Sequence, residues 1–308
     1  MDLLKLLYFL TLVSTGVGAK HADLEVYWKS KLPTSPMPKA VRDIVRNGKP
    51  PGGASFSVRP DRIPLRIYRF TAHYSPTEDQ LHYHQKVTAF FLKKDLHRGS
   101  SVNMQFIESV NDTPAFLPRQ VADSTPFSSK SVPEILNKFS VNPHSAQSEA
   151  IKKTIAECEE PAIEGEDKYC ATSLESMVDF TTSKLGKNVL AFSNEAPKNA
   201  GKIQKYGIVD VSKLNNDKAI VDDELVACHK QNYVYAVFYC HSFQNIDAYM
   251  VNLVGADGAK VKAVVVCHKD TSSWDPRHLA FQLLKVKPGA VPICHFLPGD
   301  HIVWVPKH

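Results

Sequence analysis

The dipeptide Cys-His occurs four times in this chain and uses four of its 6 cysteines. Each occurrence joins a side chain that can form a disulfide to one that can bind a metal ion or transfer a proton. The spacing follows the pattern CH-x10-CH-x25-CH-x25-CH. We therefore expect the chemistry of this protein at four pairs: Cys228-His229, Cys240-His241, Cys267-His268 and Cys294-His295.

Each Cys-His pair falls at or near the end of a predicted β-strand. Neighbouring side chains of a strand point to opposite faces, so a Cys and the His that follows it cannot easily bind one metal ion. The pattern instead predicts that the cysteines cross-link strands as two disulfides on one side, while the histidines converge on the other. Cys228 and Cys240 share a face if their strands form a regular hairpin, because they are an even number of residues apart.

The residues alone leave three interpretations of this series open. Four imidazoles without thiolates suit zinc, copper, iron or nickel, and redox chemistry at a His-ligated copper ion is compatible with sulfurs held in disulfides. Two Cys2His2 zinc sites are the second interpretation, and they would need reduced thiols. In the third, the pairs are structural only, as disulfides and hydrogen-bonded histidines.

The N-terminus predicts export from the cytosol. Lys5, the apolar run 6–13 and the small residues up to Ala19 are typical of a secretory signal at residues 1–19. The apolar run is shorter than the roughly 20 residues that span a bilayer, and no later segment is long enough, so we expect no membrane anchor.

An exported protein with an even number of cysteines favours disulfides. Cys158 and Cys170 are close in sequence and lie outside the CH series, so we expect them to pair with each other. The four CH cysteines would then pair among themselves.

Composition adds three weaker expectations. Residues 20–87 hold eight of the 20 prolines, which predicts an extended, poorly packed leader before a domain at residues 88–308. The net charge of +5 permits binding to an acidic wall polysaccharide such as pectin, and nothing resembles a nucleic-acid module. Asn111 begins a glycosylation sequon, but Pro114 directly after the sequon disfavours its use.

The periodicity predicts an α+β fold. A capping box of Thr172 and Glu175 starts a helix that Gly186 ends, and a second helix runs from Ser145 to near Cys158. A short helix is expected at 277–286, and a hairpin turn at 255–258. Strands are expected at 206–211, 224–229, 233–242, 248–254, 260–268, 293–296 and 302–305. The result is a mostly antiparallel C-terminal sheet that carries all four CH pairs, with helices on the N-terminal side of the domain.

The CH series resembles the BURP-domain proteins of plants. Further segments match that family in order, and together the resemblance covers about residues 88–308. The chain carries no N-terminal repeats, so it resembles the short-leader seed and embryo members more than the repeat-bearing polygalacturonase β-subunit branch. The matching segments are FFLKKDLHRGSSVNMQF, FLPRQVADSTPFSS, a CEE segment at Cys158, KYCATSLESMVDF, AVFYCH and CHFLPGDHIVWVP.

The resemblance implies a copper site and a substrate class. Some members of the family are copper-dependent peptide cyclases that cross-link a Tyr or Trp side chain to another position of a short peptide, usually one carried in the same precursor. The CH histidines are implicated as copper ligands, which here are His229, His241, His268 and His295.

The peptide that would be cross-linked is not evident inside the domain, because residues 107–130 contain no Tyr and no Trp. If the chain carries its own substrate, that peptide lies upstream; another chain is the alternative. His82 and His84 flank one upstream tyrosine and are interpreted as linker histidines, while His301 and His308 are expected at the surface. The upstream candidates are Tyr27, Trp28, Tyr68, Tyr74 and Tyr83, and the favoured alternative for Tyr27 and Trp28 is a hydrophobic anchor that docks the leader.

Three functions follow as expectations. The first is a secreted copper-binding protein with oxidative cross-linking activity on a Tyr- or Trp-containing peptide. The second is a non-catalytic extracellular or vacuolar protein of seed, embryo or stress physiology. The third is a cell-wall accessory protein that binds pectin. The expected location is the apoplast or cell wall, with the protein storage vacuole as the alternative.

Overall fold

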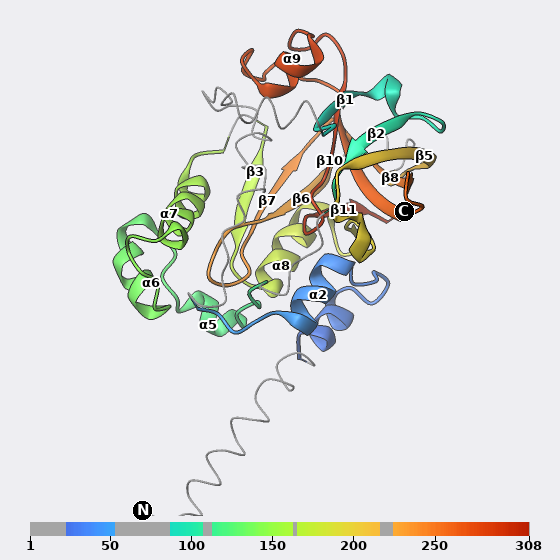
Figure 1. Ribbon diagram of the computed structural model, residues 1–308. Helices are drawn as coiled ribbons and strands as arrows, with labels where there is room; N and C mark the ends of the chain where they lie inside the picture. The colour runs from blue at the N-terminus through green and yellow to red at the C-terminus, as the bar shows by residue number, and fades with distance from the viewer. Residues whose placement is uncertain (1–22, 53–86, 107–112, 163–164, 216–223, 308) are drawn as a thin grey trace, which may run out of the picture.

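Two antiparallel β-sheets form the centre of the molecule, and most of the helices gather on one side of them (Figure 1). The computed structural model describes residues 23–52, 87–106, 113–162, 165–215 and 224–307. One sheet has six strands in the order β1-β10-β9-β8-β5-β2, and the other has five in the order β3-β7-β6-β11-β4. The expected α+β class is confirmed.

The six-stranded sheet consists of β1 (Phe90–Leu92), β2 (Ser101–Met104), β5 (Gln204–Lys213), β8 (Ile246–Gly255), β9 (Lys260–His268) and β10 (Ile293–Phe296). The five-stranded sheet consists of β3 (Asp167–Ala171), β4 (Val189–Phe192), β6 (Leu225–Lys230), β7 (Phe238–Phe243) and β11 (Ile302–Pro306). The helices are an unlabelled one at residues 23–31 and α2 (Lys39–Asn47), α5 (Arg119–Asp123), α6 (Val132–Lys138), α7 (Ala146–Glu159), α8 (Leu174–Leu185) and α9 (Leu279–Leu284). Three short 3-10 turns lie at Lys93–Asp95, Ser129–Ser131 and Lys198–Gly201.

The two sheets pack face to face around a shared apolar layer. This inner layer draws side chains from both sheets, among them Ala227 and Val303 from one and Val264 and Val266 from the other. Alternation along each strand sends the intervening residues to the outer faces. The outer face of the five-stranded sheet packs against α2 and α8 in a helix-side core that includes Val226, and the outer face of the six-stranded sheet forms a separate far-side core.

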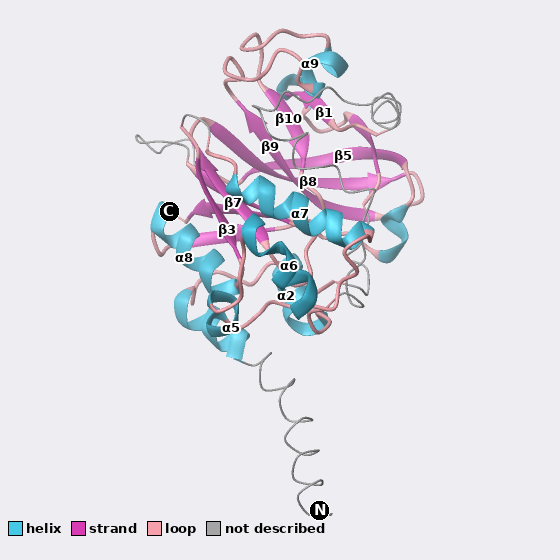
Figure 2. Ribbon diagram, turned by 90° about the vertical axis from the view of Figure 1, so that its left-hand side faces the viewer, coloured by secondary structure: helices cyan, strands magenta, loops and turns pink. Residues whose placement is uncertain are grey.

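Helices α6, α7, α8 and α2 lie together beside the sheets, whereas α9 lies at the opposite end of the molecule from α2 and α5 (Figure 2). The start of α7 is confirmed, because the Ser145 side chain accepts a hydrogen bond from the backbone N–H of Ser148. The expected capping box of α8 is wrong by one residue: Ser173 and Ser176 cap each other's backbone N–H groups, in place of Thr172 and Glu175. No helix among the described residues has the length and apolar character needed to cross a membrane.

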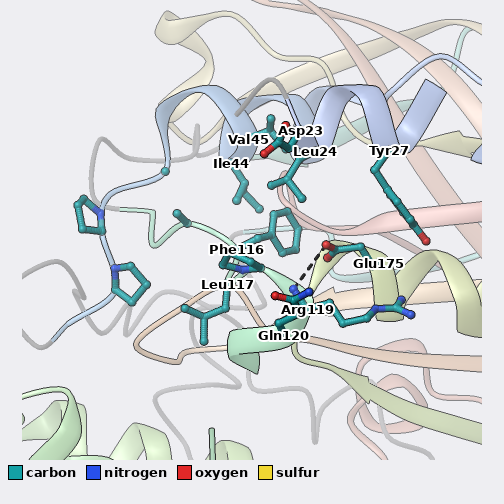
Figure 3. A pocket seen from close by; sticks show the side chains of 15 residues that line it. Asp23, Leu24, Tyr27, Ile44, Val45, Phe116, Leu117, Arg119, Gln120 and Glu175 are labelled. Carbon is teal, nitrogen blue, oxygen red and sulfur yellow. Dashed lines mark hydrogen bonds between the residues drawn. The ribbon is translucent and has the colours of Figure 1, made fainter. Parts of the chain in front are cut away.

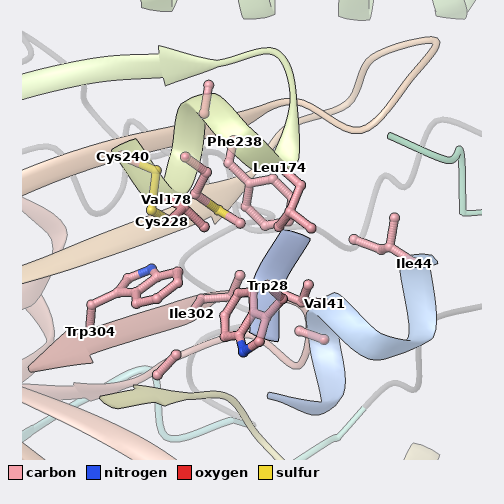
Figure 4. Packing of buried hydrophobic residues seen from close by; sticks show 14 of the residues in the cluster. Trp28, Val41, Ile44, Leu174, Val178, Cys228, Phe238, Cys240, Ile302 and Trp304 are labelled. Carbon is pink, nitrogen blue, oxygen red and sulfur yellow. A yellow bond between two sulfur atoms is a disulfide. The ribbon is translucent and has the colours of Figure 1, made fainter. Parts of the chain in front are cut away.

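The expected extended leader is wrong for its first part. Residues 23–31 form a helix, α2 follows it, and both pack on the helix-side core. The Trp28 ring lies 5.4 Å from that of Trp304, and its indole N–H donates to the backbone oxygen of Ser35 (Figure 4). Prolines therefore lie at the ends of these short helices and do not keep the segment extended. Residues 53–86 lie outside the described residues.

The single sheet expected for all four CH pairs is replaced by two. Strands β6 and β7 carry two pairs in the five-stranded sheet, and β9 and β10 carry two in the six-stranded sheet. Strand β7 also begins five residues later than expected, because Tyr233 and Tyr235 lie in a buried loop that packs under α6 and α7. The hairpin turn between β8 and β9 is confirmed, and Gly258 has a positive φ of 83° there.

Candidate buried histidine site

All six cysteines lie in described segments and form disulfides. Cys158 pairs with Cys170, as expected from the sequence. The CH cysteines pair within each sheet, where Cys228 lies directly opposite Cys240 and Cys267 lies directly opposite Cys294, the two bonds being Cys228–Cys240 and Cys267–Cys294. Two Cys2His2 zinc sites are therefore excluded in this structure, because no thiol is left to ligate an ion.

The CH disulfides and the CH histidines lie on opposite faces of their sheets. The sulfurs belong to the two outer cores, one to the helix-side core and one to the far-side core. His241 lies opposite Ala227, and His295 lies opposite Val266, so both imidazoles face the inner layer between the sheets. His229 and His268 follow the same alternation. Four imidazoles thus enter one interior space from two directions.

The first histidine pair comes from the five-stranded sheet. The Nε2 atoms of His229 and His241 are 2.9 Å apart, and both side chains are buried. His241 Nδ1 lies 3.0 Å from Oε1 of Glu166, which precedes β3. His229 Nδ1 lies 2.8 Å from Nδ1 of His301, in the turn before β11. Each ring therefore has its Nδ1 engaged at the back and its Nε2 turned toward the other ring.

The second pair comes from the six-stranded sheet. The rings of His268 and His295 stack with centroids 5.5 Å apart, and their Nε2 atoms are separated by 3.4 Å. His295 Nδ1 lies 3.3 Å from the backbone oxygen of Phe296. Trp274 packs edge-on against His268 at 5.0 Å, and Phe90 packs edge-on against His295. This half of the site thus has an aromatic wall, whereas the first half is polar.

Burial favours the neutral form of His229, His268 and His295. It lowers the pKa of His295 to about 4, and it lowers the pKa values of His229 and His268 well below 6.5. Repulsion from other histidines adds to burial: His229 is opposed by His301, His241, His295 and His268 in that order. This repulsion between the two pairs accords with imidazoles that face the same inner layer. Neutral imidazole is the form that ligates metal ions.

Sequence reasoning missed two side chains of this site. Glu166 has a side chain that is 4% exposed, and it also accepts a hydrogen bond from the Tyr239 hydroxyl. His301 was expected at the surface, and this is wrong, because it is buried against His229. The sequence signals were an acidic residue just before a strand and a histidine in the same C-terminal segment as a CH pair. Neither signal reveals which strand lies beside it in space.

The donor pairs fit a transition-metal ion by spacing and chemistry. With metal–nitrogen bonds of about 2.0–2.1 Å, two ligands at roughly 90–110° have nitrogens about 2.9–3.4 Å apart. The Nε2 separations in the two pairs, 2.9 Å and 3.4 Å, fall in that range. Among the described residues, no three His, Cys, Asp or Glu side chains are arranged as a complete metal site. The described residues therefore present two pairs of imidazole nitrogens, and neither pair belongs to a group of three or more such side chains that could hold an ion.

The upstream aromatic candidates are not brought to the histidines. Trp28 lies in the helix-side core, across the five-stranded sheet from the inner layer. Tyr27 lines an apolar pocket of about 580 Å³ on that same side, together with Ile44, Phe116 and Glu175 (Figure 3). This pocket is separate from the histidine site. Tyr68, Tyr74, Tyr83, His82, His84 and Asn111 lie outside the described residues, as do the signal segment and His308.

Comparison with known proteins identifies a family and several plant relatives. The profile of the BURP domain matches residues 89–306. The chain is 50% identical over 240 residues to BURP domain protein RD22 of Arabidopsis thaliana, which covers 76% of this chain and 60% of that protein. It is 42% identical over 298 residues to BURP domain-containing protein 5 of Oryza sativa subsp. japonica, which covers 93% of this chain and 89% of that protein.

A third relative is Protein RAFTIN 1A of Triticum aestivum, with 37% identity over 222 residues, 71% of this chain and 56% of that protein. The match thus spans only 60% and 56% of RD22 and RAFTIN 1A, but most of the length of the rice protein. The family profile extends over all the strands and disulfides that carry the histidines. The chain belongs to the BURP domain family.

Proposed function

We propose that this BURP-domain protein binds a copper ion through His229, His241, His268 and His295 and promotes oxidative cross-linking of a Tyr or Trp side chain in a peptide. The observation that carries the proposal is the pairwise Nε2-to-Nε2 approach of four buried histidines from two sheets. The disulfides support it, because they leave imidazole as the ligand type at the site.

The surrounding residues suit such a site. The lowered pKa values of His229, His268 and His295 keep these rings neutral, and therefore able to ligate, in mildly acidic surroundings. Glu166 and His301 hold the outer nitrogens of their partners. Packing by Trp274 and Phe90 limits access of water to the second pair. A bound copper ion would supply one-electron oxidation of a phenol or indole.

The proposed substrate is a peptide that contains Tyr or Trp. Trp28 is buried on the far side of a sheet from the histidines, which argues against it as a substrate while its helix stays docked. Tyr27 is half-buried on the same side of the sheet, and its hydroxyl donates to Asp179 on α8 at 3.3 Å, so it also lies away from the histidines. The remaining candidates are Tyr68, Tyr74 and Tyr83 of the same chain, or a peptide from another chain.

The test is the intact mass of the purified chain, fully reduced and alkylated, before and after incubation with Cu(II) in air. A copper-dependent loss of about two hydrogens, localised by fragmentation, supports cross-linking within the chain. The His241→Ala variant should lose the change, whereas the matched variant His144→Ala, at an exposed position, should keep it. A cross-link that persists in His241→Ala would contradict the proposal.

Two other functions remain as outcomes of that experiment. Copper binding without a mass change would favour action on another peptide, which added Tyr- and Trp-containing peptides would reveal. No copper binding would favour a non-catalytic extracellular or vacuolar protein. Salt-sensitive retention on polygalacturonate would favour a wall accessory role, for which the net charge of +5 is the only support. Export to the apoplast or wall, or to the storage vacuole, is part of the proposal.

A further inference from the structure

Four side chains form a continuous buried chain of hydrogen-bond contacts in the first half of the site. Glu166 Oε1 lies 3.0 Å from His241 Nδ1, and His241 Nε2 lies 2.9 Å from His229 Nε2. His229 Nδ1 then lies 2.8 Å from His301 Nδ1. We call this series, Glu166–His241–His229–His301, the histidine relay.

Glu166, at one end of the histidine relay, sets the donor-to-acceptor direction of each hydrogen bond in it. An ionised carboxylate only accepts hydrogen bonds, whereas a neutral imidazole donates from one nitrogen and accepts at the other. His241 must therefore donate from Nδ1 to Glu166, which leaves Nε2 as its acceptor. His229 must then donate from Nε2 and accept at Nδ1, so His301 must donate from Nδ1. One proton order satisfies all three contacts when the rings are neutral.

We propose that Glu166 is a positioning residue that fixes the tautomer of His241 and, through it, the proton order of the whole histidine relay. The Tyr239 hydroxyl supports this role, because it donates to the same Oε1 at 3.1 Å and restrains the carboxylate. The Glu166 side chain is 4% exposed, so water does not compete for this contact. The contact with Glu166 therefore leaves His241 Nε2 unprotonated, with its lone pair facing the interior.

The histidine relay also predicts what must change when an ion is held by both Nε2 atoms, a step that rests on the proposed function. His241 is already in the required tautomer. His229 must lose its Nε2 proton and carry one on Nδ1, which then donates to His301 Nδ1. That contact requires the His301 proton to move to Nε2, which lies 3.9 Å from the Asp300 carboxylate. The proton count of the three rings is unchanged, so the exchange is a shift between tautomers.

The first experiment needs no metal. Two-bond proton–nitrogen correlation NMR of the 15N-labelled, metal-free protein reports which ring nitrogen of each histidine carries the proton. We expect Nδ1–H at His241, Nε2–H at His229 and Nδ1–H at His301. An Nε2–H tautomer or a doubly protonated ring at His241 would overturn the proposal, whatever the protein binds.

Variants separate positioning from a structural role. Glu166→Ala removes the acceptor and should shift His241 toward the Nε2–H tautomer, while Glu166→Gln, whose amide oxygen can still accept, should retain Nδ1–H. Glu149→Ala is the matched control, because that carboxylate is 70% exposed and pairs with Lys152. A merely structural Glu166 would lower the melting temperature of the Ala variant without moving the tautomer, and that result would overturn the proposal.

The second experiment adds Zn(II), a diamagnetic ion that also accepts imidazole ligands. We expect His229 to change from Nε2–H to Nδ1–H on binding, and Glu166→Ala to bind Zn(II) about 10- to 100-fold more weakly than Glu149→Ala. Bound Zn(II) with His229 still in the Nε2–H form would overturn the predicted exchange. If Zn(II) and Cu(II) both fail to bind, the proposed function fails, but the metal-free tautomers still decide the role of Glu166.

Discussion

Cys228 lies directly opposite Cys240 in the pairing of β6 with β7, and their Cα atoms are 4.0 Å apart. The same register recurs between β9 and β10, where the CH cysteines also face each other. In both cases each histidine is one residue past its cysteine and lies diagonally across from the other histidine. The disulfide therefore locks the strand register that sets the spacing of the two imidazoles on the opposite face.

Removal of this disulfide should weaken both the fold and the site. For Cys228→Ala combined with Cys240→Ala we expect a loss of about 3 kcal/mol in the free energy of unfolding, because a disulfide that closes a loop of this size restricts the unfolded chain by that order. We also expect weaker binding of Cu(II) or Zn(II). Denaturant unfolding and metal titration measure the two effects.

The Cys158–Cys170 disulfide is the control for the stability loss, because it has the same sequence separation of 12 residues. Its removal should cost a similar free energy of unfolding. Unchanged metal affinity in the Cys228→Ala, Cys240→Ala protein would show that the inner layer alone holds the register.

The docked N-terminal helix should contribute strongly to stability. Trp28→Ala removes a 2% exposed indole that packs on Trp304 and donates to the backbone of Ser35, and we expect a loss of about 3–5 kcal/mol. Val26→Ala, at a position that is 65% exposed on the same helix, should change stability by less than about 0.5 kcal/mol. Similar melting temperatures for the two variants would contradict the packing described here.

The buried histidines predict how the stability of the metal-free protein depends on pH. Burial lowers the folded-state pKa of His295 from 6.5 to about 4, and the pKa values of His229 and His268 are lowered in the same direction. As the pH falls, the unfolded chain takes up these protons before the folded chain does. The contribution of the neutral histidines to the free energy of unfolding is therefore complete above about pH 6.5 and is lost as the pH falls toward about 4. Urea unfolding at a series of pH values measures it.

A neutral replacement tests the assignment of this pH dependence. His268→Gln cannot charge, so its stability should fall less steeply between pH 6.5 and 4 than that of the unaltered protein. An equally steep fall in both proteins would assign the dependence to other groups.

Asp247 predicts a second, separate electrostatic contribution. Burial opposes its ionisation, but hydrogen bonds from Lys93 and Lys213 outweigh burial and lower the pKa to about 2. Lys269 lies 3.6 Å from the same carboxylate. For Asp247→Asn we expect a loss of about 1.5–3 kcal/mol, because hydrogen bonds to a charged group are replaced by neutral ones. The contribution should disappear as the pH falls from 3.8 toward 2.

An exposed ion pair provides the comparison for Asp247. Glu195 and Lys262 lie 3.5 Å apart with side chains more than half exposed, so Glu195→Gln should cost less than about 1 kcal/mol. Equal losses for Asp247→Asn and Glu195→Gln in denaturant unfolding would contradict a structural role for the buried carboxylate.

The arrangement within each CH pair could be predicted because it is local. Alternation along a strand is enough to place Cys228 and His229 on opposite faces, and the side-chain spacing of α7 follows from Ser145 and the apolar residues after it. The number of sheets could not be predicted in this way. Whether the β6–β7 and β9–β10 pairs share a sheet depends on which strands become neighbours through contacts distant in sequence.

Glu166 and His301 show the same limit at the site. Each is separated from its histidine partner by more than 70 residues, and each lies outside a strand, where no periodicity indicates a direction. Docking of the leader was expected at Tyr27 and Trp28 alone, whereas the composition of residues 20–87 predicted poor packing for the rest. Its prolines argued against packing, but Pro38 directly precedes α2 and does not interrupt it, and Val41, Ile44 and Trp28 then supply enough apolar surface to cover the sheet.

The contact between the first described helix and β11 shows that the boundary of the packed fold differs from the boundary of the family profile. The family profile begins at residue 89, yet residues 23–47 cover part of the outer face of the five-stranded sheet, beside α8. A fragment that starts at the profile boundary would lack Trp28, the ring that packs on Trp304, and would expose part of this apolar cluster to solvent. The packed unit of the fold is thus larger than the part of the chain that defines the family, and a protease that removes these helices would uncover apolar surface that favours self-association.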